Sequence, residues 1–339
     1  MSAIIKNITI TVLLSLIFLQ QGCNLYDDDY VPPIFPDPET GIYYVGHLKT
    51  NGNAVYVKGK VINQVQYAFL ADGPAGLQII NVTNGESPSL TYNFQTNGFL
   101  REVFIDTIKG KHYAFLSDEI KGLYVLDVTN PANPETDTVL SYISGVNTAG
   151  RTGNYIYAAT VSGSVFILGL DSLPDKVYEI NSYNPVNPVK HIEIQGNVGY
   201  FIENTTGLEI VNLENPQQPV RYTTFHSPGS SNDIRIAGNL AYIADGTTGI
   251  TVISISNPVQ PYFIKSVSIE TDIRYLDYSP NYLFTGEYSD GISVFNLFNT
   301  STPELLGYYI PTEKCNGVHF FKAKILIANG TDGLLITRF

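Results

Sequence analysis

The residues with the clearest chemical potential are acids, bases and histidines that alternate with single apolar residues. This pattern occurs three times, as His191-Ile192-Glu193, Asp233-Ile234-Arg235 and Asp272-Ile273-Arg274. On a β-strand, residues two apart lie on the same face, so each pattern brings two polar groups together. Such pairs can bind an anionic or polar ligand, or they can join neighbouring strands as buried ion pairs.

The sequence lacks the motifs that would predict a particular reaction. It has no glycine-rich phosphate loop, zinc-binding helix, nucleophile elbow or paired-cysteine metal motif. No two acids have a spacing that assigns the roles of general acid and general base. We therefore predict no catalytic residue, no metal and no cofactor. The dipeptides Asp72-Gly73, Asp245-Gly246 and Asn329-Gly330 are interpreted as turns that need a positive φ rather than as calcium ligands.

The elements that position these polar groups belong to a repeated unit, which a recurring glycine marks along the chain. The glycine stands at residues 76, 122, 163, 207, 249, 291 and 333, at intervals of about 42 residues. An apolar hexad rich in β-branched and aromatic residues follows each of them, for example LYVLDV from residue 123. Such residues favour strands over helices. A second apolar run precedes each glycine, so each pair of runs is predicted to form a hairpin.

Two further strands complete each unit. Six of the units carry an Asx eight residues after the glycine and then a proline, as in Asn257 and Pro261. These residues end one strand and turn the chain into the next. Strands are then expected over 220–225 and 262–267, followed by strands over 233–237 and 272–276. Each unit thus contains four short antiparallel strands.

Seven such units predict a seven-bladed β-propeller. A β-sandwich has no reason to repeat at this interval, and the rung of a β-helix is usually much shorter. Apolar residues on both faces of the strands fit blades that are packed between two others. The last unit stops six residues after Gly333, while residues 41–49 form a spare strand before the first complete unit. We expect this N-terminal strand to pair with residues 334–338 and close the ring.

The repeat resembles the LVIVD-type β-propeller repeat of secreted bacterial and archaeal proteins. The residues that carry the resemblance are LYVLDVTNPANP at 123–134, LEIVNLENPQQP at 208–219 and ITVISISNPVQP at 250–261. It covers essentially residues 41–339, although the third unit departs from it around Gly163. The resemblance implies a seven-bladed ring outside the cytoplasm and no particular reaction.

In such a ring, the innermost strands and the loops that lead into them converge on a central channel. Aligning the hairpins places Glu193, Arg235 and His319 in equivalent positions, and the repeated Asp-Ile-Arg adds Arg274. The candidate binding residues at the channel mouth are Arg101, Arg151, His191, Glu193, Asp233, Arg235, Asp272, Arg274 and His319. Two hypotheses remain, a ligand-binding polar ring and a network that joins adjacent blades. The network is the simpler one, because buried charges need partners where strands crowd together.

The first 40 residues predict export and attachment to a membrane. Residues 1–22 contain Lys6, an apolar run and a final glycine directly before Cys23, which resembles a lipoprotein signal peptide. Cys23 would then carry the lipid; the alternative is an ordinary signal peptide that is cleaved nearby. Residues 23–40 form an acidic, proline-rich tether. Its acidic cluster at 27–29 resembles the surface-export signal of lipoproteins in Bacteroidetes-like bacteria, and could also be a plain linker or a weak calcium site.

The net charge makes some classes of partner unfavourable, and the cysteine content bears on the thiol chemistry of the chain. The net charge is −12, so the surface repels nucleic acid and anionic lipid headgroups, and membrane attachment must come from the acyl chain. If Cys23 is acylated, only Cys315 remains, and we expect it to be a buried structural thiol rather than a reactive one.

These features favour a non-catalytic, lipid-anchored binding or scaffold module for a protein partner at the bacterial outer membrane, exposed at the cell surface, with the periplasmic face of that membrane as the alternative location. The alternative is an accessory lipoprotein that binds or cleaves glycans during nutrient capture. The absence of Trp weakens the glycan hypothesis somewhat, although Tyr is abundant. A redox or quinone-type propeller enzyme is a third possibility.

Overall fold

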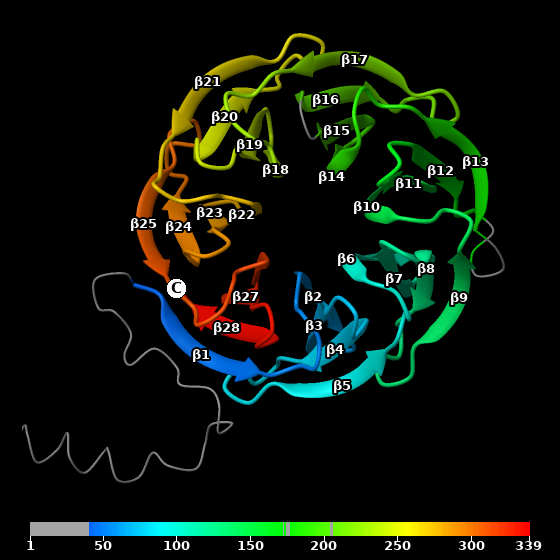
Figure 1. Ribbon diagram of the computed structural model, residues 1–339, viewed down its shortest axis with the longest axis vertical. Helices are drawn as coiled ribbons and strands as arrows, with labels where there is room; N and C mark the ends of the chain where they lie inside the picture. Colours follow the sequence, from blue (N-terminus) through cyan, green and yellow to red (C-terminus); the bar gives the residue numbers. More distant parts are fainter. Residues whose placement is uncertain (1–40, 172, 174–176, 204–205) are drawn as a thin grey trace, which may run out of the picture. The chain divides into compact units, whose positions relative to one another are not determined.

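The computed structural model describes residues 41–171, 173, 177–203 and 206–339. They form seven four-stranded antiparallel sheets arranged as blades around a central channel (Figure 1). The predicted seven-bladed β-propeller is confirmed. In the described part of the chain, no helix is long and apolar enough to cross a membrane. Residues 1–40, with the predicted signal peptide, Cys23 and the tether, lie outside the described residues.

Each blade is built from four strands in order from the channel outwards. The innermost strands of blades one to seven are β2 (Tyr56–Ile62), β6 (Leu100–Ile108), β10 (Val146–Thr152), β14 (Val189–Gln195), β18 (Asp233–Ala237), β22 (Tyr275–Ser279) and β26 (Gly317–Phe321). The second strands are β3 (Val65–Ala71), β7 (Lys111–Asp118), β11 (Tyr155–Thr160), β15 (Val198–Glu203), β19 (Leu240–Ala244), β23 (Tyr282–Gly286) and β27 (Lys324–Ala328). The third strands are β4 (Leu77–Asn81), β8 (Gly122–Asp127), β12 (Val165–Gly169), β16 (Gly207–Asn212), β20 (Ile250–Ser254), β24 (Ile292–Asn296) and β28 (Leu334–Arg338). The outermost strands are β5 (Ser89–Phe94), β9 (Glu135–Leu140), β13 (Tyr178–Tyr183), β17 (Val220–Phe225), β21 (Tyr262–Val267), β25 (Glu304–Tyr309) and β1 (Tyr43–Leu48).

The recurrent glycines end the turns between the second and third strands. All seven have a positive φ, as the turn interpretation requires. Gly249 illustrates the reason, since its φ is 94° and a Cβ atom there would lie 2.1 Å from the carbonyl oxygen of Val267. A side chain would therefore be strained and would collide with the outermost strand. Gly73, Gly246 and Gly330 also have positive φ, which confirms their predicted place in turns.

The turns between the third and fourth strands follow the predicted Asx chemistry. The side-chain oxygen of Asn257 accepts a hydrogen bond from the backbone N–H of Val259 at 3.2 Å. Asn84, Asn130, Asn215 and Asn299 do the same with the residue two positions on. Each asparagine thus holds its own turn. The proline of the third unit, Pro174, lies outside the described residues.

The apolar core lies between adjacent blades rather than within one of them. One buried cluster contains Phe115 of blade two and Ile156 of blade three. Another combines Val252 of blade five with Leu283 and Phe295 of blade six. This arrangement explains the two-sided apolar strands, because each sheet has a neighbour on both faces. It also makes the position of each innermost strand depend on both of its neighbours.

The two ends of the propeller meet in blade seven, whose strand order is β1-β28-β27-β26. Tyr43 pairs with Arg338 and Leu48 pairs with Leu334, so β1 runs antiparallel to β28. The predicted closure by the N-terminal strand is confirmed.

The ring has two distinct faces. We call "mouth face" the side with the loops that lead into the innermost strands and the turns between second and third strands. The opposite side, where β1 begins, is the "tether face".

One predicted strand has a different register. The innermost strand of blade six, expected at 272–276, is β22 at Tyr275–Ser279. The preceding Asp-Ile-Arg belongs to the loop, where Ile273 forms a bridge with Gly246 of blade five. The sequence match to blade five was therefore misleading, because Tyr275, and not Asp272, is the residue paired with the end of the second strand.

Candidate functional site at the channel mouth

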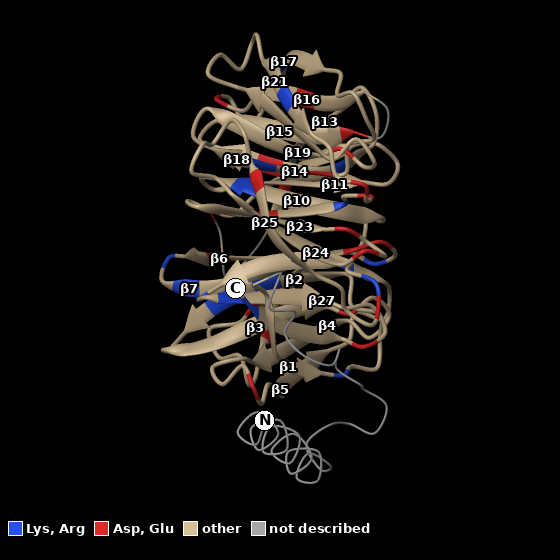
Figure 2. Ribbon diagram, turned by 90° about the vertical axis from the view of Figure 1, so that its left-hand side faces the viewer, with Lys and Arg blue, Asp and Glu red and all other residues tan. Residues whose placement is uncertain are grey.

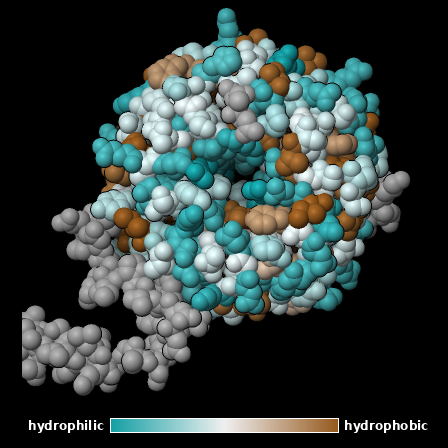
Figure 3. All heavy atoms as spheres, in the orientation of Figure 1, coloured by the Kyte–Doolittle hydropathy of each residue, from teal (hydrophilic) through white to brown (hydrophobic). Residues whose placement is uncertain are grey.

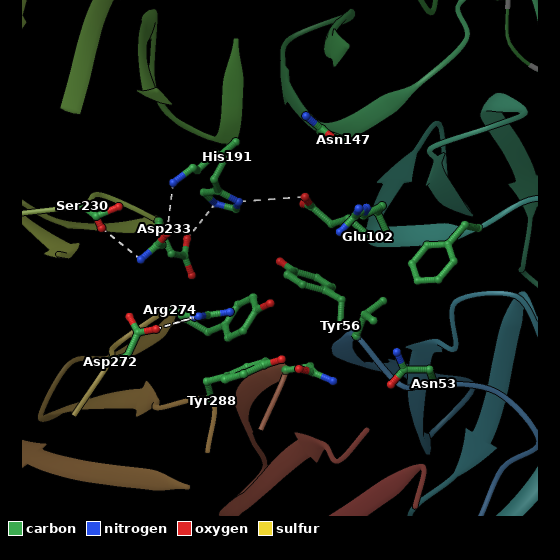
Figure 4. A pocket seen from close by; sticks show the side chains of 17 residues that line it. Asn53, Tyr56, Glu102, Asn147, His191, Ser230, Asp233, Asp272, Arg274 and Tyr288 are labelled. Carbon is green, nitrogen blue, oxygen red and sulfur yellow. Dashed lines mark hydrogen bonds and ion pairs between the residues drawn. The ribbon is translucent and has the colours of Figure 1, made fainter. Parts of the chain in front are cut away.

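A cavity of about 560 Å³ opens at the mouth face, where the innermost strands begin (Figure 4). Its volume lies within the range of small-molecule sites. Figure 3 shows a hollow at the centre of the ring, bordered mainly by hydrophilic residues. All seven blades contribute to the lining, which consists of Asn53, Val55, Tyr56, Phe99, Arg101, Glu102, Asn147, Lys190, His191, Ser230, Asn232, Asp233, Asp272, Arg274, Tyr275, Tyr288 and Asn316.

Strand register defines two layers of equivalent positions around the channel. The upper layer, nearer the mouth face, pairs with the last or next-to-last residue of each second strand and contains Tyr56, Glu102, Thr148, His191, Asp233, Tyr275 and Gly317. Two residues further along each strand, the lower layer contains Lys58, Phe104, Gly150, Glu193, Arg235, Asp277 and His319. The predicted equivalence of Glu193, Arg235 and His319 is confirmed. Asp277, and not Arg274, is their counterpart in blade six.

A network of charges in these layers crosses from blade to blade. Arg235 Nη1 donates to Asp233 Oδ1 at 2.7 Å, and Arg235 Nε lies 3.7 Å from Asp277 Oδ1. His191 Nε2 lies 3.2 Å from the same oxygen of Asp233. Figure 2 shows acidic and basic positions side by side around β14 and β18. The guanidinium is thus held between the carboxylates of two blades.

The carboxylates of the network also accept hydrogen bonds from the backbone of the next blade. Asp233 Oδ2 accepts from the N–H of Leu276 at 2.8 Å. Asp277 Oδ2 accepts from the N–H of Phe320 at 2.7 Å and lies 3.0 Å from His319 Nδ1. Each acid therefore fixes the innermost strand of its neighbour.

Burial and charge shift the pKa values of these groups. Burial lowers the pKa of His191, but Asp233, Glu193 and Glu102 together raise it above its ordinary value. Burial would raise the pKa of Asp277, but His319, Lys58 and Arg235 hold it well below its usual range. Burial raises the pKa of Glu102, whose carboxylate lies 3.9 Å from His191 on the opposite side from Asp233 (Figure 4). The floor of the cavity thus contains His191 between the carboxyl groups of Asp233 and Glu102.

Two basic side chains at the rim of the cavity, Arg274 and Lys190, are each held by partners. The Arg274 guanidinium lies 3.9 Å from the centre of the Tyr288 ring and forms an ion pair of 2.7 Å with Asp272 (Figure 4). Lys190 Nζ donates to the carbonyl oxygen of Ser231 and to Asn232 Oδ1. Because an ammonium has three donors and an Arg has five, both retain donors for a ligand.

Buried acids in the turns hold the mouth-face loops in place. Asp245 accepts hydrogen bonds from the N–H of Gly229 and the hydroxyl of Ser231, both in the loop that leads into β18. Asp72 accepts from Thr50 in the corresponding loop of blade one. Burial raises the pKa of Asp72 to about 6. Sequence reasoning missed this role, although an acid directly after the second strand in several units was a visible signal.

The predicted site residues separate into three groups. Arg101, His191, Asp233, Asp272 and Arg274 line the cavity. Glu193, Arg235 and His319 lie one layer deeper, in the inter-blade network. Arg151 lies near the far end of β10 and pairs with Asp106 of blade two, so its predicted place at the mouth is wrong. Sequence reasoning missed Lys190, Tyr288 and the four asparagines of the lining.

The cavity offers hydrogen-bond donors and acceptors that can bind a ligand. The most deeply buried charged groups of the cavity form ion pairs with one another. The hydrogen-bond donors that remain available lie at the rim. Cys315 is buried, and burial raises the pKa of its thiol to about 12. Cys315 therefore presents no thiolate nucleophile near neutral pH.

Fold and site together define a seven-bladed β-propeller with a polar cavity at one mouth of its channel. Three segments match the LVIVD repeat, at residues 54–96, 107–139 and 228–269. The chain is thus a seven-bladed propeller that contains LVIVD repeats. The comparison with curated proteins gives no significant sequence match.

Similar solved structures show the fold alone. The WD40 domain of Pan2 from Neurospora crassa superposes with a TM-score of 0.68 at 10% identity, covering 90% of this chain and 97% of that domain. The computationally designed Ika8 protein superposes with a TM-score of 0.64 at 8% identity, covering 88% of this chain and all of the designed one.

Proposed function

We propose that this protein is a non-catalytic binding module, held at the outer membrane by a lipid on Cys23, that binds a protein partner through its mouth face. The fold and its LVIVD repeats are consistent with a binding or scaffold module. The observation that carries the proposal is the cavity itself, to which all seven blades contribute and whose walls are held by the inter-blade ion pairs. Such a rigid site costs little ordering entropy when a partner binds.

Exposed aliphatic side chains on the mouth face favour a protein over a small molecule. Ile120 and Val161 stand in the turns of blades two and three, and Val186 lies in the loop that leads into β14. A protein interface typically combines such apolar contacts with anchoring charged groups. The partner would place a polar group in the cavity and cover these residues.

A photo-crosslinking experiment on the full chain in its native envelope tests this function. A benzophenone amino acid replaces Val161 on the mouth face or, as a matched control, Leu90 on the outer strand β5. Their side chains are similarly exposed, at 47% and 52%. We expect a discrete protein adduct from position 161 that disappears when Ser230→Trp blocks the cavity. Equal adducts at both positions, or none at 161, would contradict the proposal.

Glycan binding is the second candidate function. Asn53, Asn147, Asn232 and Asn316 line the cavity together with the ring of Tyr288, and amides and aromatic rings are suited to sugar hydroxyls and sugar faces. A glycan array with soluble residues 39–339 and with the Ser230→Trp variant distinguishes the two. Glycan binding that the blocking variant abolishes would favour this second function.

A further inference from the structure

The outer rim of blades four to seven carries a run of exposed apolar side chains near the tether face. We call this the rim arc; its members are Val220, Val259, Tyr262, Phe263, Phe298, Leu305, Leu306, Tyr43 and Phe339. They stand at the start of the outermost strands, in the turns before them, or at the chain end that pairs with β1. The strands β17, β21, β25 and β1 follow one another along this rim (Figure 1).

The rim arc is specific to one side of the ring. The corresponding positions at the start of β9 in blade two are Glu135, Thr136 and Asp137. Within the described residues of blades one to three, Leu90 is the one large apolar side chain that is exposed at such a position. The repeat itself therefore does not demand an apolar rim. An exposed apolar area of this extent usually marks an interaction surface.

Phe298 is the most exposed member of the rim arc. It stands in the turn before β25 and is 96% exposed, although the turn itself is held by the side chain of Asn296, which accepts a hydrogen bond from the Phe298 N–H at 2.7 Å. A fixed turn thus presents a fully solvated aromatic ring. Such a ring gains free energy when it moves into an apolar or interfacial environment.

The described chain begins beside the rim arc, and this position suggests which surface covers it. The described chain begins at Gly41, where a Cβ atom would lie 3.8 Å from the ring of Phe339, a member of the rim arc. Cys23 precedes Gly41 by only 18 residues, a length that spans at most about 60 Å. A lipid on Cys23 would therefore hold the propeller near a bilayer, with the rim arc beside the point where the tether enters the described chain.

We infer that the rim arc is a membrane-contact surface that rests on the interface of a bilayer with neutral headgroups. Tyr and Phe side chains at one edge of a folded domain are suited to this interface, because rings with apolar bodies collect there. In this position the mouth face is turned away from the lipid and stays open to a partner. The inference rests on the lipid anchor of the proposed function, but it depends on no group of the cavity.

Tryptophan fluorescence tests the membrane contact, because the chain contains no Trp. Phe298→Trp places a single emitter in the rim arc, and Ile120→Trp is the matched control on the mouth face. Both are made in residues 24–339, which lack the lipid acceptor, and mixed with neutral phosphatidylcholine and phosphatidylethanolamine vesicles that carry brominated acyl chains. We expect a blue shift and quenching of about twofold at position 298 and no change at 120.

Vesicle flotation supplies the second measurement. Replacing Tyr262, Phe298 and Leu305 together by Ser should lower the vesicle-bound fraction about tenfold, whereas Ile120→Ser with Val161→Ser should leave it unchanged. Equal quenching at positions 120 and 298, or no quenching at 298, overturns the inference. Self-association that depends on the rim arc also overturns it, because a second copy would then be the occupant. The substitutions at Tyr262, Phe298 and Leu305 change no residue that lines the mouth cavity, so they leave ligand binding at the mouth unaffected and failure of either proposal is seen separately.

Discussion

Replacing Arg235 by Gln should destabilise the propeller far more than replacing Arg274 by Gln. Arg235 is 7% exposed and is surrounded by Asp233, Asp277 and Glu193. Removing one partner from a buried ion pair costs about 3–5 kcal/mol, because the remaining charges stay buried without compensation. The Arg274 side chain is 40% exposed, and a pair of that kind contributes about 0–1 kcal/mol.

Thermal unfolding of residues 39–339 measures the difference. A ring of about 300 residues has an unfolding entropy of about 0.6 kcal/mol per kelvin, so a loss of about 4 kcal/mol lowers Tm by about 6 °C. The Arg274→Gln variant should melt within about 2 °C of the unmodified chain and should weaken partner binding instead. If both variants melt together, or if Arg235→Gln is as stable as the unmodified chain, the assignment of Arg235 to a structural network is refuted.

Three further predictions concern closure, pH and the thiol. Deleting residues 41–49 should abolish cooperative unfolding, because blade seven loses β1; an equally sharp melting curve in the deletion variant would contradict closure. Burial raises the pKa of Asp72 to about 6, so the folded protein binds a proton at Asp72 more tightly than the unfolded chain does. The unfolding free energy should therefore fall by about 2 kcal/mol as pH rises from 4 to 6. The Asp72→Asn variant should lack this decrease in urea titrations, and identical pH profiles would disprove the shift. Cys315 should react with a thiol reagent such as DTNB only after unfolding, so rapid labelling of the native chain would be inconsistent with its burial.

Repetition made the fold predictable from the sequence. The strands at 220–225, 233–237 and 262–267 match β17, β18 and β21 residue for residue. Each unit supplies the same signals again, so an uncertain strand in one unit is corrected by its equivalents. The glycines are informative because their positive φ is a backbone requirement, which leaves little freedom to other residues.

The site was harder to predict because it depends on single residues that differ between units. The Asp-Ile-Arg of blade six resembles that of blade five, yet it precedes its strand, and a shift of three residues moves Arg274 from the network to the rim. Arg151 was misplaced because polarity alone does not say which end of β10 a side chain occupies. Lys190 and Tyr288 come from different blades and meet only after the ring has closed. Sequence spacing within one unit contains no information on such contacts.

Closure by a single strand determines the face of the ring on which the described chain begins. In every blade the innermost strand begins at the mouth face, so the outermost strand, three turns later, must run from the tether face towards the mouth face. Because β1 is an outermost strand, its first residue lies at the tether face, as the pairing of Tyr43 with Arg338 shows. A ring closed by two N-terminal strands would instead begin at the mouth face and place its anchor beside the cavity. Closure by one N-terminal strand therefore puts the start of the described chain on the face opposite the cavity.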